Sequence, residues 1–224
     1  LPYLGAMGRT AYEQTGGHII NHLDHSSSVE LCKQAVDCGY MSVMIDASMC
    51  PLEENIAKTR EVVEYAHKYG VVVEAEIGRI LGRNVEGTYE GDEYLVQVAD
   101  AVRMAEETGV DSLAVGIGTA HGFYKEAPRI NIQRLVEVNA AVAIPLVLHG
   151  GTGVPAETVR ACICNGMAKV NVGTQLHATY LAELRRQLEK TAAPNVSEVL
   201  YPVKAAIKPV VKDWIRLCGA NGRY

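Results

Sequence analysis

Short apolar runs rich in β-branched residues recur along the chain, and each is followed by a stretch with helical spacing. The runs cover residues 18–24, 42–47, 71–78, 112–118, 144–150 and 168–173. Glycine closes three of the helical stretches, at Gly70, Gly109 and Gly166. Strands that alternate with helices at intervals of a few tens of residues indicate βα units and a parallel sheet.

Polar side chains gather at the carboxyl ends of all six predicted strands. They are Asp24 and His25, then Asp46, Glu76, His121 and His149, and finally Asn171 and Thr174. In an open doubly wound sheet the ligand occupies one crevice, so only some strands should end in such residues. In a closed barrel all the carboxyl ends meet at one mouth, where the chemistry occurs. The pattern therefore predicts an α/β fold of the (β/α)8 TIM barrel type.

A closed barrel of this type needs eight strands, and the sequence offers six. The chain also begins within what reads as a helix ahead of the first strand. We therefore expect that the first two strands are absent from this sequence. No stretch has the composition of a linker, so residues 1–224 are expected to form a single domain.

Composition excludes several classes of protein. The net charge is −5 and no run of Lys or Arg stands out, which argues against nucleic-acid binding. No apolar run approaches the roughly 20 residues of a membrane span. The six cysteines lack paired CxxC spacing and read as reduced thiols, which predicts a cytoplasmic protein.

Three histidines follow strands at equivalent positions. His25, His121 and His149 together could hold Zn²⁺ and leave one position open for a substrate, as a catalytic zinc requires. Any one of them alone is as well explained as a hydrogen-bonded loop residue, but three at equivalent strand ends favour a metal site. His22 shares a strand face with Asp24 and is a candidate partner of the site. The remaining histidines read as structural: His18, His67 and His177.

Two glycine-rich loops, 149–153 and 171–174, each lie between a strand and a helix. Glycine lets backbone N–H groups approach an anion, and helix N-termini favour negative charge. With two strands missing, these are the loops after strands seven and eight, which commonly bind phosphate in barrels. Ordinary turns also use Gly and Thr, but two adjacent loops of this kind favour phosphate.

Seven motifs in register resemble the zinc-dependent class II ketose-bisphosphate aldolases. They are HLDHSSS, SVMIDAS, EENIAKTREVVEYAH, VEAEIG, GVDSLAVGIGTAHG, PLVLHGGTG and KVNVGT, and the resemblance continues to the closing VVKDWIRLCGANGRY. Those enzymes cleave fructose or tagatose 1,6-bisphosphate on a (β/α)8 barrel. The family's N-terminal βαβ portion has no counterpart here, in agreement with the strand count.

The resemblance implies a role for each matching residue. His25, His121 and His149 would bind zinc, and Asp24 would transfer the proton of a substrate hydroxyl as the C3–C4 bond breaks. Zinc would polarise the C2 carbonyl and stabilise the enediolate; a monovalent cation is allowed in addition. Asp46 and Glu76 match positions that hold a second or displaced metal in some relatives, or else they order the histidines. The dihydroxyacetone phosphate half would contact Gly122, Gly150, Gly151, Thr152, Asn171, Val172, Gly173 and Thr174.

Asp24 has a competing interpretation as the N-cap of the helix that follows. That interpretation is weaker, because Ser26, Ser27 or Ser28 could cap the helix instead.

The chain also departs from the family pattern. Asn84 falls near an expected Glu, so Glu86, Glu90 or another residue of that loop is left as the base for the enediolate proton. Gln175 stands where the family often has Asp or Glu. Position 173 is Gly, whereas fructose-type members tend to have Asp or Asn and tagatose-type members Ala. The choice between the two ketoses, or another ketose phosphate, therefore stays open.

The leading function is a class II aldolase that cleaves a ketose 1,6-bisphosphate to dihydroxyacetone phosphate and glyceraldehyde 3-phosphate. The resemblance further implies a role in carbohydrate metabolism such as glycolysis, and a homodimer or homotetramer. Two alternatives are a metal-dependent hydrolase on a TIM barrel and a non-catalytic barrel subunit. A Schiff-base aldolase is disfavoured, because Lys169 begins its strand and is expected far from the barrel mouth.

Overall fold

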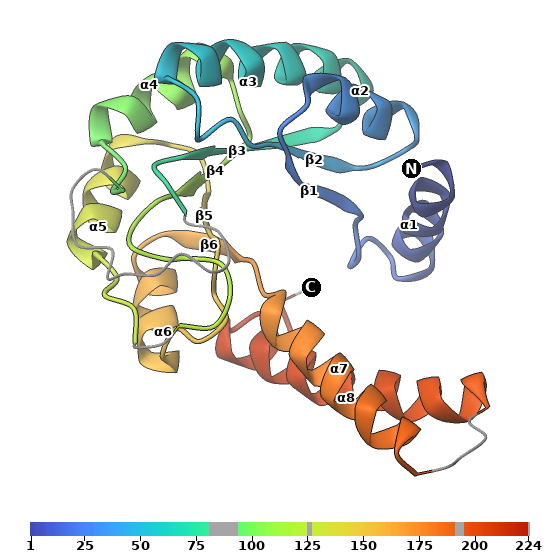
Figure 1. Cartoon of the computed structure of the whole chain (residues 1–224). Helices are drawn as coiled ribbons and strands as arrows, with labels where there is room; N and C mark the ends of the chain where they lie inside the picture. The colour runs from blue at the N-terminus through green and yellow to red at the C-terminus, as the bar shows by residue number, and fades with distance from the viewer. Residues whose placement is uncertain (81–93, 125–126, 191–194, 224) are drawn as a thin grey trace.

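Six strands form one parallel sheet in the computed structural model, which describes residues 1–80, 94–124, 127–190 and 195–223. Each strand pairs in parallel with the next one along the chain. The strands are β1 (His22–Ser26), β2 (Ser42–Ile45), β3 (Val72–Ile77), β4 (Ser112–Val115), β5 (Leu146–Leu148) and β6 (Met167–Val170). The sheet curls, with β1 and β6 as its two edges, and all the carboxyl ends lie on one side (Figure 1).

Helices cover the convex outer face of the sheet, and a helical hairpin extends away from it (Figure 1). The outer layer consists of α2 (Val29–Asp37), α3 (Leu52–Ala66) with the 3₁₀ turn η1 (His67–Tyr69), α4 (Val98–Thr108), α5 (Ile132–Ala141) and α6 (Ala156–Cys164). α1 (Pro2–Gln14) precedes β1, and the hairpin is α7 (Thr174–Leu188) and α8 (Val196–Leu217). Among the described residues, no helix has the length and apolar character needed to cross a membrane.

Local sequence explains where these helices start and stop. Ser28 caps α2, because its hydroxyl accepts the backbone N–H of Leu31 at 3.2 Å. Gly70 and Gly109 end η1 and α4 with φ angles of 69° and 68°, a left-handed conformation that glycine adopts without strain. The Ser28 cap leaves the carboxylate of Asp24 available for another role.

The strands divide their side chains between two apolar layers because successive residues point to opposite faces. Val43 and Ile45 of β2 pack outward against the helices in the main core. Met44 points to the inner face, where it joins a small cluster with Ala114 of β4 and Val147 of β5. This apolar floor closes the inside of the sheet beneath the polar strand ends.

The start of α7 is joined to α8 by a hydrogen bond between side chains. The indole Nε1–H of Trp214 on α8 donates to the Gln175 side-chain oxygen at 2.8 Å. Gln175, which departs from the family pattern, therefore joins the two helices and is not among the residues that line the cavity beside the strand ends.

The predicted α/β fold is confirmed as a curled parallel sheet of βα units with the six expected strands. The start of the first strand was predicted wrongly: residues 18–21 form a loop, and β1 runs from His22 to Ser26. In that loop the side-chain oxygen of Asn21 accepts the backbone N–H of Met41, an alternative to strand pairing. That residues 1–224 form a single domain stays a prediction.

Candidate active site

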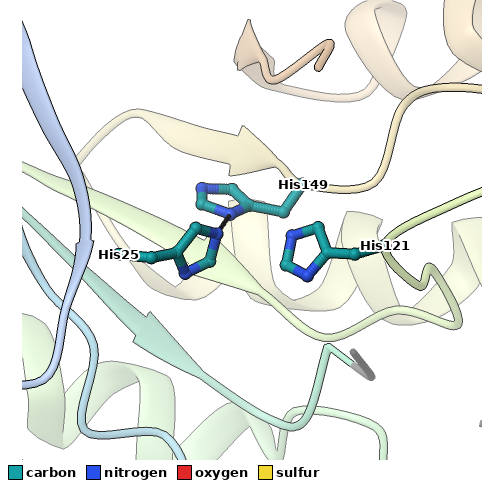
Figure 2. A group of neighbouring side chains, drawn as sticks. All are labelled: His25, His121 and His149. Carbon is teal, nitrogen blue, oxygen red and sulfur yellow. Dashed lines mark hydrogen bonds between the residues drawn. The ribbon is translucent and has the colours of Figure 1, made fainter. Parts of the chain in front are cut away.

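Three imidazole rings meet at the carboxyl ends of the strands. His25 comes from β1, His121 follows β4, and His149 follows β5 (Figure 2). The ring centroid of His25 lies 4.8 Å from that of His121 and 4.6 Å from that of His149, and the last two are 5.9 Å apart. The structure thus brings together the three histidines that the sequence singled out.

His25 reaches this position through an unusual backbone conformation. Its φ is +50°, and it is the one residue other than glycine with a positive φ among those the structure describes. The β1–β2 pairing is irregular between Leu23 and Ser26, so the strand bends at His25. Such a conformation typically costs about 1–3 kcal/mol and is retained where the surroundings enforce it, often at functional sites.

The hydrogen bonds of two histidines leave two lone pairs facing each other. His25 donates from Nδ1 to Asp46 Oδ2, and His149 donates from Nε2 to Glu74 Oε1, both at 2.8 Å. The remaining nitrogens, His25 Nε2 and His149 Nδ1, are only 2.8 Å apart. Two unprotonated nitrogens repel at that distance unless a proton or a cation lies between or beside them. Imidazoles whose outer N–H groups donate to carboxylates are typical metal ligands.

A buried carboxylate oxygen lies beside the same rings. Glu76 Oε2 is 3.7 Å from His149 Nδ1 and 4.0 Å from His25 Nδ1, and it has no hydrogen-bond partner among the described residues. Burial, with the neighbouring Asp46, raises the pKa of Glu76 to about 8. A buried carboxylate oxygen without a partner is costly, and a nearby cation would offset that cost.

Two sets of donor atoms are therefore compact enough to hold a cation. One is His25, His121 and His149, and the other is His25, Asp46 and Glu76. Burial and the two neighbouring histidines lower the pKa of His121 to about 4, so its ring is neutral at pH 7. Burial also lowers the pKa of His25, but the Asp46 hydrogen bond and nearby carboxylates outweigh it and raise the net value. The first set has the composition of a zinc site.

A cavity of about 540 Å³ opens beside the histidines. All eight residues predicted to contact substrate line it: Gly122, Gly150, Gly151, Thr152, Asn171, Val172, Gly173 and Thr174. Asp24, His25 and His121 line it as well, together with His22, Lys169, Val170 and His177. His177, which reads as structural in the sequence, thus lies at the cavity.

Asp24 links the two edge strands of the sheet across the mouth. Its Oδ1 accepts the side-chain amide N–H of Asn171, which follows β6, at 3.1 Å. The same amide nitrogen lies 3.1 Å from His149 Nε2. The Asp24 side chain is 53% exposed, so it faces the cavity and is available to a bound molecule. His22, with its Nε2 3.8 Å from Asp24 Oδ1, is fixed by a 2.7 Å hydrogen bond to Ser42.

The two glycine-rich loops are held against each other and against the His121 loop. Gly151 N–H donates to the Asn171 carbonyl at 3.2 Å, and the Thr152 hydroxyl accepts the N–H of Gln175 at 3.2 Å. Gly150 has a φ of +67°, and a Cβ there would lie 2.3 Å from the carbonyl oxygen of Ala120. Only glycine fits at that position. The loops form one surface at the start of α7.

Glu74 and Tyr124 are contributors to the site that the sequence pattern did not reveal. Glu74 lies two residues before Glu76 on β3 and is 3% exposed. Glu74 and Glu76 are acids at alternate positions of an otherwise apolar strand, so both side chains share the inner face. This spacing could have predicted that Glu74 belongs to the site. The Tyr124 hydroxyl accepts the N–H of Ala120 at 2.8 Å and donates to the Gly150 carbonyl at 2.9 Å, which joins the His121 and His149 loops.

The expected position of Lys169 was wrong. Its Nζ lies 2.6 Å from Glu74 Oε2, and the side chain lines the cavity. Lys169 precedes Asn171 by two residues, which is about 7 Å along a strand. A lysine side chain spans nearly that distance, so its ammonium group reaches the level of the strand ends. Glu86 and Glu90, the two candidates for the enediolate base, fall outside the described residues, as does Asn84.

Two further expectations from the sequence concern His67 and the cysteines. His67 pairs with Asp111 at 2.9 Å on the outer surface, as a structural residue would. All six cysteines are free thiols, as expected from their spacing.

A curled sheet of parallel βα units whose strand ends gather histidines, acids and glycine-rich loops defines an α/β-barrel protein with a candidate metal site. The sequence model of the family described as fructose-bisphosphate aldolase class-II matches residues 1–223. The chain belongs to this family, which confirms the resemblance seen in its motifs. Family membership implies an aldolase, a lyase that acts on a carbon–carbon bond.

Individual relatives agree with this assignment. Fructose-bisphosphate aldolases of Staphylococcus aureus and Staphylococcus epidermidis are 41% identical over 203 residues, which is 90% of this chain and 71% of theirs. The YdjI aldolase of Escherichia coli superposes with a TM-score of 0.83 at 30% identity, over 98% of this chain and 77% of that one. A putative fructose-1,6-biphosphate aldolase of Coccidioides immitis gives a TM-score of 0.83 at 30% identity, over 98% and 78%.

Proposed function

We propose that the protein is a zinc-dependent aldolase that reversibly cleaves a ketose 1,6-bisphosphate, of the fructose or tagatose configuration. The products would be dihydroxyacetone phosphate and glyceraldehyde 3-phosphate. One observation carries the proposal: His25 Nε2 and His149 Nδ1 face each other at 2.8 Å beside the ring of His121, at the edge of a cavity lined by two glycine-rich loops.

His25, His121 and His149 would hold the zinc ion, and their outer hydrogen bonds orient two of them toward it. Asp46 and Glu76 would order the histidines or provide a second cation position. Bound zinc supplies a Lewis acid that polarises the substrate carbonyl. A monovalent cation would bind at the site in addition to zinc.

Asp24 would transfer the proton of the C4 hydroxyl when the C3–C4 bond breaks or forms. The amide of Asn171 occupies one carboxylate oxygen and fixes the orientation of the group. The other carboxylate oxygen, Oδ2, remains available to the substrate. Glu86, Glu90 or another residue of the same loop would act as the base at C3.

The phosphate of the dihydroxyacetone half would bind where the two glycine-rich loops meet. Gly150, Gly151 and Thr152 of the first loop and Val172 and Gly173 of the second line the cavity there, and α7 begins at Thr174. The N-terminus of a 15-residue helix favours an anion. The hydroxyl of Thr174 has no hydrogen bond to compete with a phosphate oxygen among those described, unlike that of Thr152.

A Schiff-base aldolase is the second candidate, because Lys169 lines the cavity after all. Its ammonium group is engaged with Glu74 at 2.6 Å, whereas a Schiff base needs a free amine. Borohydride treatment in the presence of dihydroxyacetone phosphate distinguishes the two mechanisms. A trapped adduct on Lys169 would replace the zinc proposal.

The decisive experiment measures cleavage of fructose and tagatose 1,6-bisphosphate by the full chain, with zinc quantified in the same preparation. We expect chelation to abolish cleavage and Zn²⁺ to restore it. His149→Ala should lose both zinc and activity, while His67→Ala, a surface histidine paired with Asp111, should retain both. Full activity in metal-free protein would contradict the proposal. Hydrolysis of a phosphate or amide bond without carbon–carbon cleavage would favour the metal-dependent hydrolase, and zinc binding without turnover would favour the non-catalytic subunit.

We further propose that the protein assembles as a homodimer or homotetramer through the α7–α8 hairpin and resides in the cytoplasm. The hairpin exposes large apolar side chains, of which Leu181 is 62% and Tyr201 75% exposed. Six unpaired cysteines suit a reducing compartment. Sedimentation velocity on the wild type and on Leu181→Lys tests the assembly. A monomeric wild type would contradict it.

A further inference from the structure

A cluster of three residues, two of them buried, lies on the inner face of the sheet around His149. The Glu74 carboxylate accepts a hydrogen bond from His149 Nε2 on one oxygen, at 2.8 Å, and contacts Lys169 Nζ with the other, at 2.6 Å. Glu74 belongs to β3, His149 follows β5 and Lys169 belongs to β6. The cluster therefore spans the interior of the curled sheet, and none of its members is adjacent to another in the chain.

The burial of His149 and Glu74 calls for an explanation, whereas Lys169 is 38% exposed at the cavity. His149 is fully buried and Glu74 is 3% exposed. A buried carboxylate is retained only where partners offset the loss of hydration, and an apolar replacement is often as stable. Both Glu74 oxygens have a partner, and each contact has a defined direction. The arrangement suits a group that must hold another side chain in one orientation.

The orientation matters because the two nitrogens of His149 face different surroundings. Two groups lie near Nε2: the Glu74 carboxylate at 2.8 Å, which can only accept, and the amide nitrogen of Asn171 at 3.1 Å, which already donates to Asp24. The shorter contact, with a charged acceptor, places the proton on Nε2, and the lone pair of Nδ1 then points toward His25 and the candidate zinc position. The opposite tautomer would place an N–H where a ligand lone pair is needed. A carboxylate behind an imidazole ligand selects the tautomer and increases the basicity of the ligand nitrogen.

We propose that Glu74 is a positioning residue that sets the tautomer and ring orientation of His149 for zinc, and that Lys169 acts through Glu74 as its counter-ion. The proposal rests on the proposed zinc centre and assigns two residues that are not themselves ligands. Among the described residues that line the cavity, Lys169 is the one lysine or arginine. Its ion pair with Glu74 places it as part of the metal support and not as a nucleophile.

The test compares Glu74→Gln, Glu74→Met, Lys169→Met and the Glu74→Met/Lys169→Met double variant in the full chain. Zinc affinity is measured by competition with a chromophoric chelator. Glu74→Gln keeps an acceptor for Nε2–H but loses the charge, so we expect its zinc affinity to fall about tenfold. Glu74→Met loses both, so we expect its zinc affinity to fall about a hundredfold, within the range typical of such partners. The matched control is the exposed pair Glu53 and Arg103, 2.7 Å apart, whose variants Glu53→Gln and Arg103→Met should bind zinc as the wild type does.

A second measurement does not depend on metal. Nitrogen-15 NMR of histidine-labelled, metal-free protein reports which ring nitrogen of His149 carries the proton. We expect Nε2–H in the wild type and in Glu74→Gln, and a mixture of tautomers in Glu74→Met. If the wild type binds no zinc while the tautomer still shifts in Glu74→Met, the zinc centre fails and the positioning role stands.

Other outcomes overturn the inference itself. Equal zinc affinity in the wild type and both folded Glu74 variants would reduce the cluster to a structural ion pair, whose loss lowers only the thermal midpoint. For Lys169, the double variant should bind zinc no more weakly than Glu74→Met alone, because the lysine acts through the carboxylate. Additive losses would show that Lys169 acts on zinc or its ligands by another route.

Discussion

The hydroxyl of Tyr124 joins the two loops that carry His121 and His149, and Tyr124→Phe removes only that oxygen. Its loss leaves the Ala120 N–H and the Gly150 carbonyl, at 2.8 and 2.9 Å, without their shared partner. A hydrogen bond of this kind contributes about 1 kcal/mol net, and an unsatisfied buried group costs about 1–3 kcal/mol. The Tyr124 hydroxyl is partly buried, so water replaces some of the loss. We expect the free energy of unfolding to fall by about 2 kcal/mol.

Urea denaturation followed by circular dichroism measures this effect in metal-free protein. With a slope of about 2 kcal/mol per molar urea, the midpoint should move down by about 1 M without a change in slope. The matched control is Tyr3→Phe on α1, because Tyr3 is 87% exposed and its variant should stay within about 0.5 kcal/mol of the wild type. An unchanged midpoint in Tyr124→Phe would refute the reasoning that this hydroxyl clamps the loops.

Three further predictions test the site and the fold. Asp24→Asn should lower the cleavage rate about 10²–10⁴-fold while zinc content and exchange of the C3 proton of dihydroxyacetone phosphate persist; loss of zinc together with both rates would make Asp24 a support for the metal. Thr174→Val should weaken binding of dihydroxyacetone phosphate by about ten- to a hundredfold, since hydrogen bonds to charged groups contribute about 1.5–3 kcal/mol. Unchanged affinity in calorimetry would exclude the hydroxyl from phosphate binding. Burial raises the pKa of the Cys162 thiol to about 11, so its reactive thiolate is scarce at pH 8 and increases about tenfold per pH unit below that pKa. Iodoacetamide with mass spectrometry should therefore label the exposed Cys164 first, and equal rates at pH 8 would contradict the packing of α6.

Much of the fold follows from local patterns in the sequence. The predicted strand 42–47 contains β2, Ser42–Ile45, because a buried parallel strand is largely apolar. The predicted strand 71–78 contains β3, Val72–Ile77, in which Glu74 and Glu76 alternate with apolar residues. The polar residues that end these runs are visible for the same reason. Since parallel strands align their carboxyl ends, the order of strands and helices along the chain is enough to predict that those residues converge.

Local patterns were misleading where the backbone leaves regular geometry. The apolar residues Ile19 and Ile20 resemble a strand, yet both are exposed in a loop. The irregular pairing that gives His25 its positive φ lies within β1. Histidine tolerates a positive φ better than most residues, but few histidines adopt it, so the residue type alone does not predict the bend. Tertiary contacts with Asp46 and His149 hold the ring in place.

The sequence by itself determined which residues stand at the ends of the strands, and tertiary structure decided what each of them contacts. Glu74 meets His149 and Lys169 across sequence separations of 75 and 95 residues, so no periodicity or motif spacing relates them. Lys169 was placed wrongly because the position of its Cα along the strand was known, whereas the direction of its long side chain was not. That direction is set by the buried charge of Glu74, which the ammonium group offsets, and this charge becomes a neighbour only when the sheet curls.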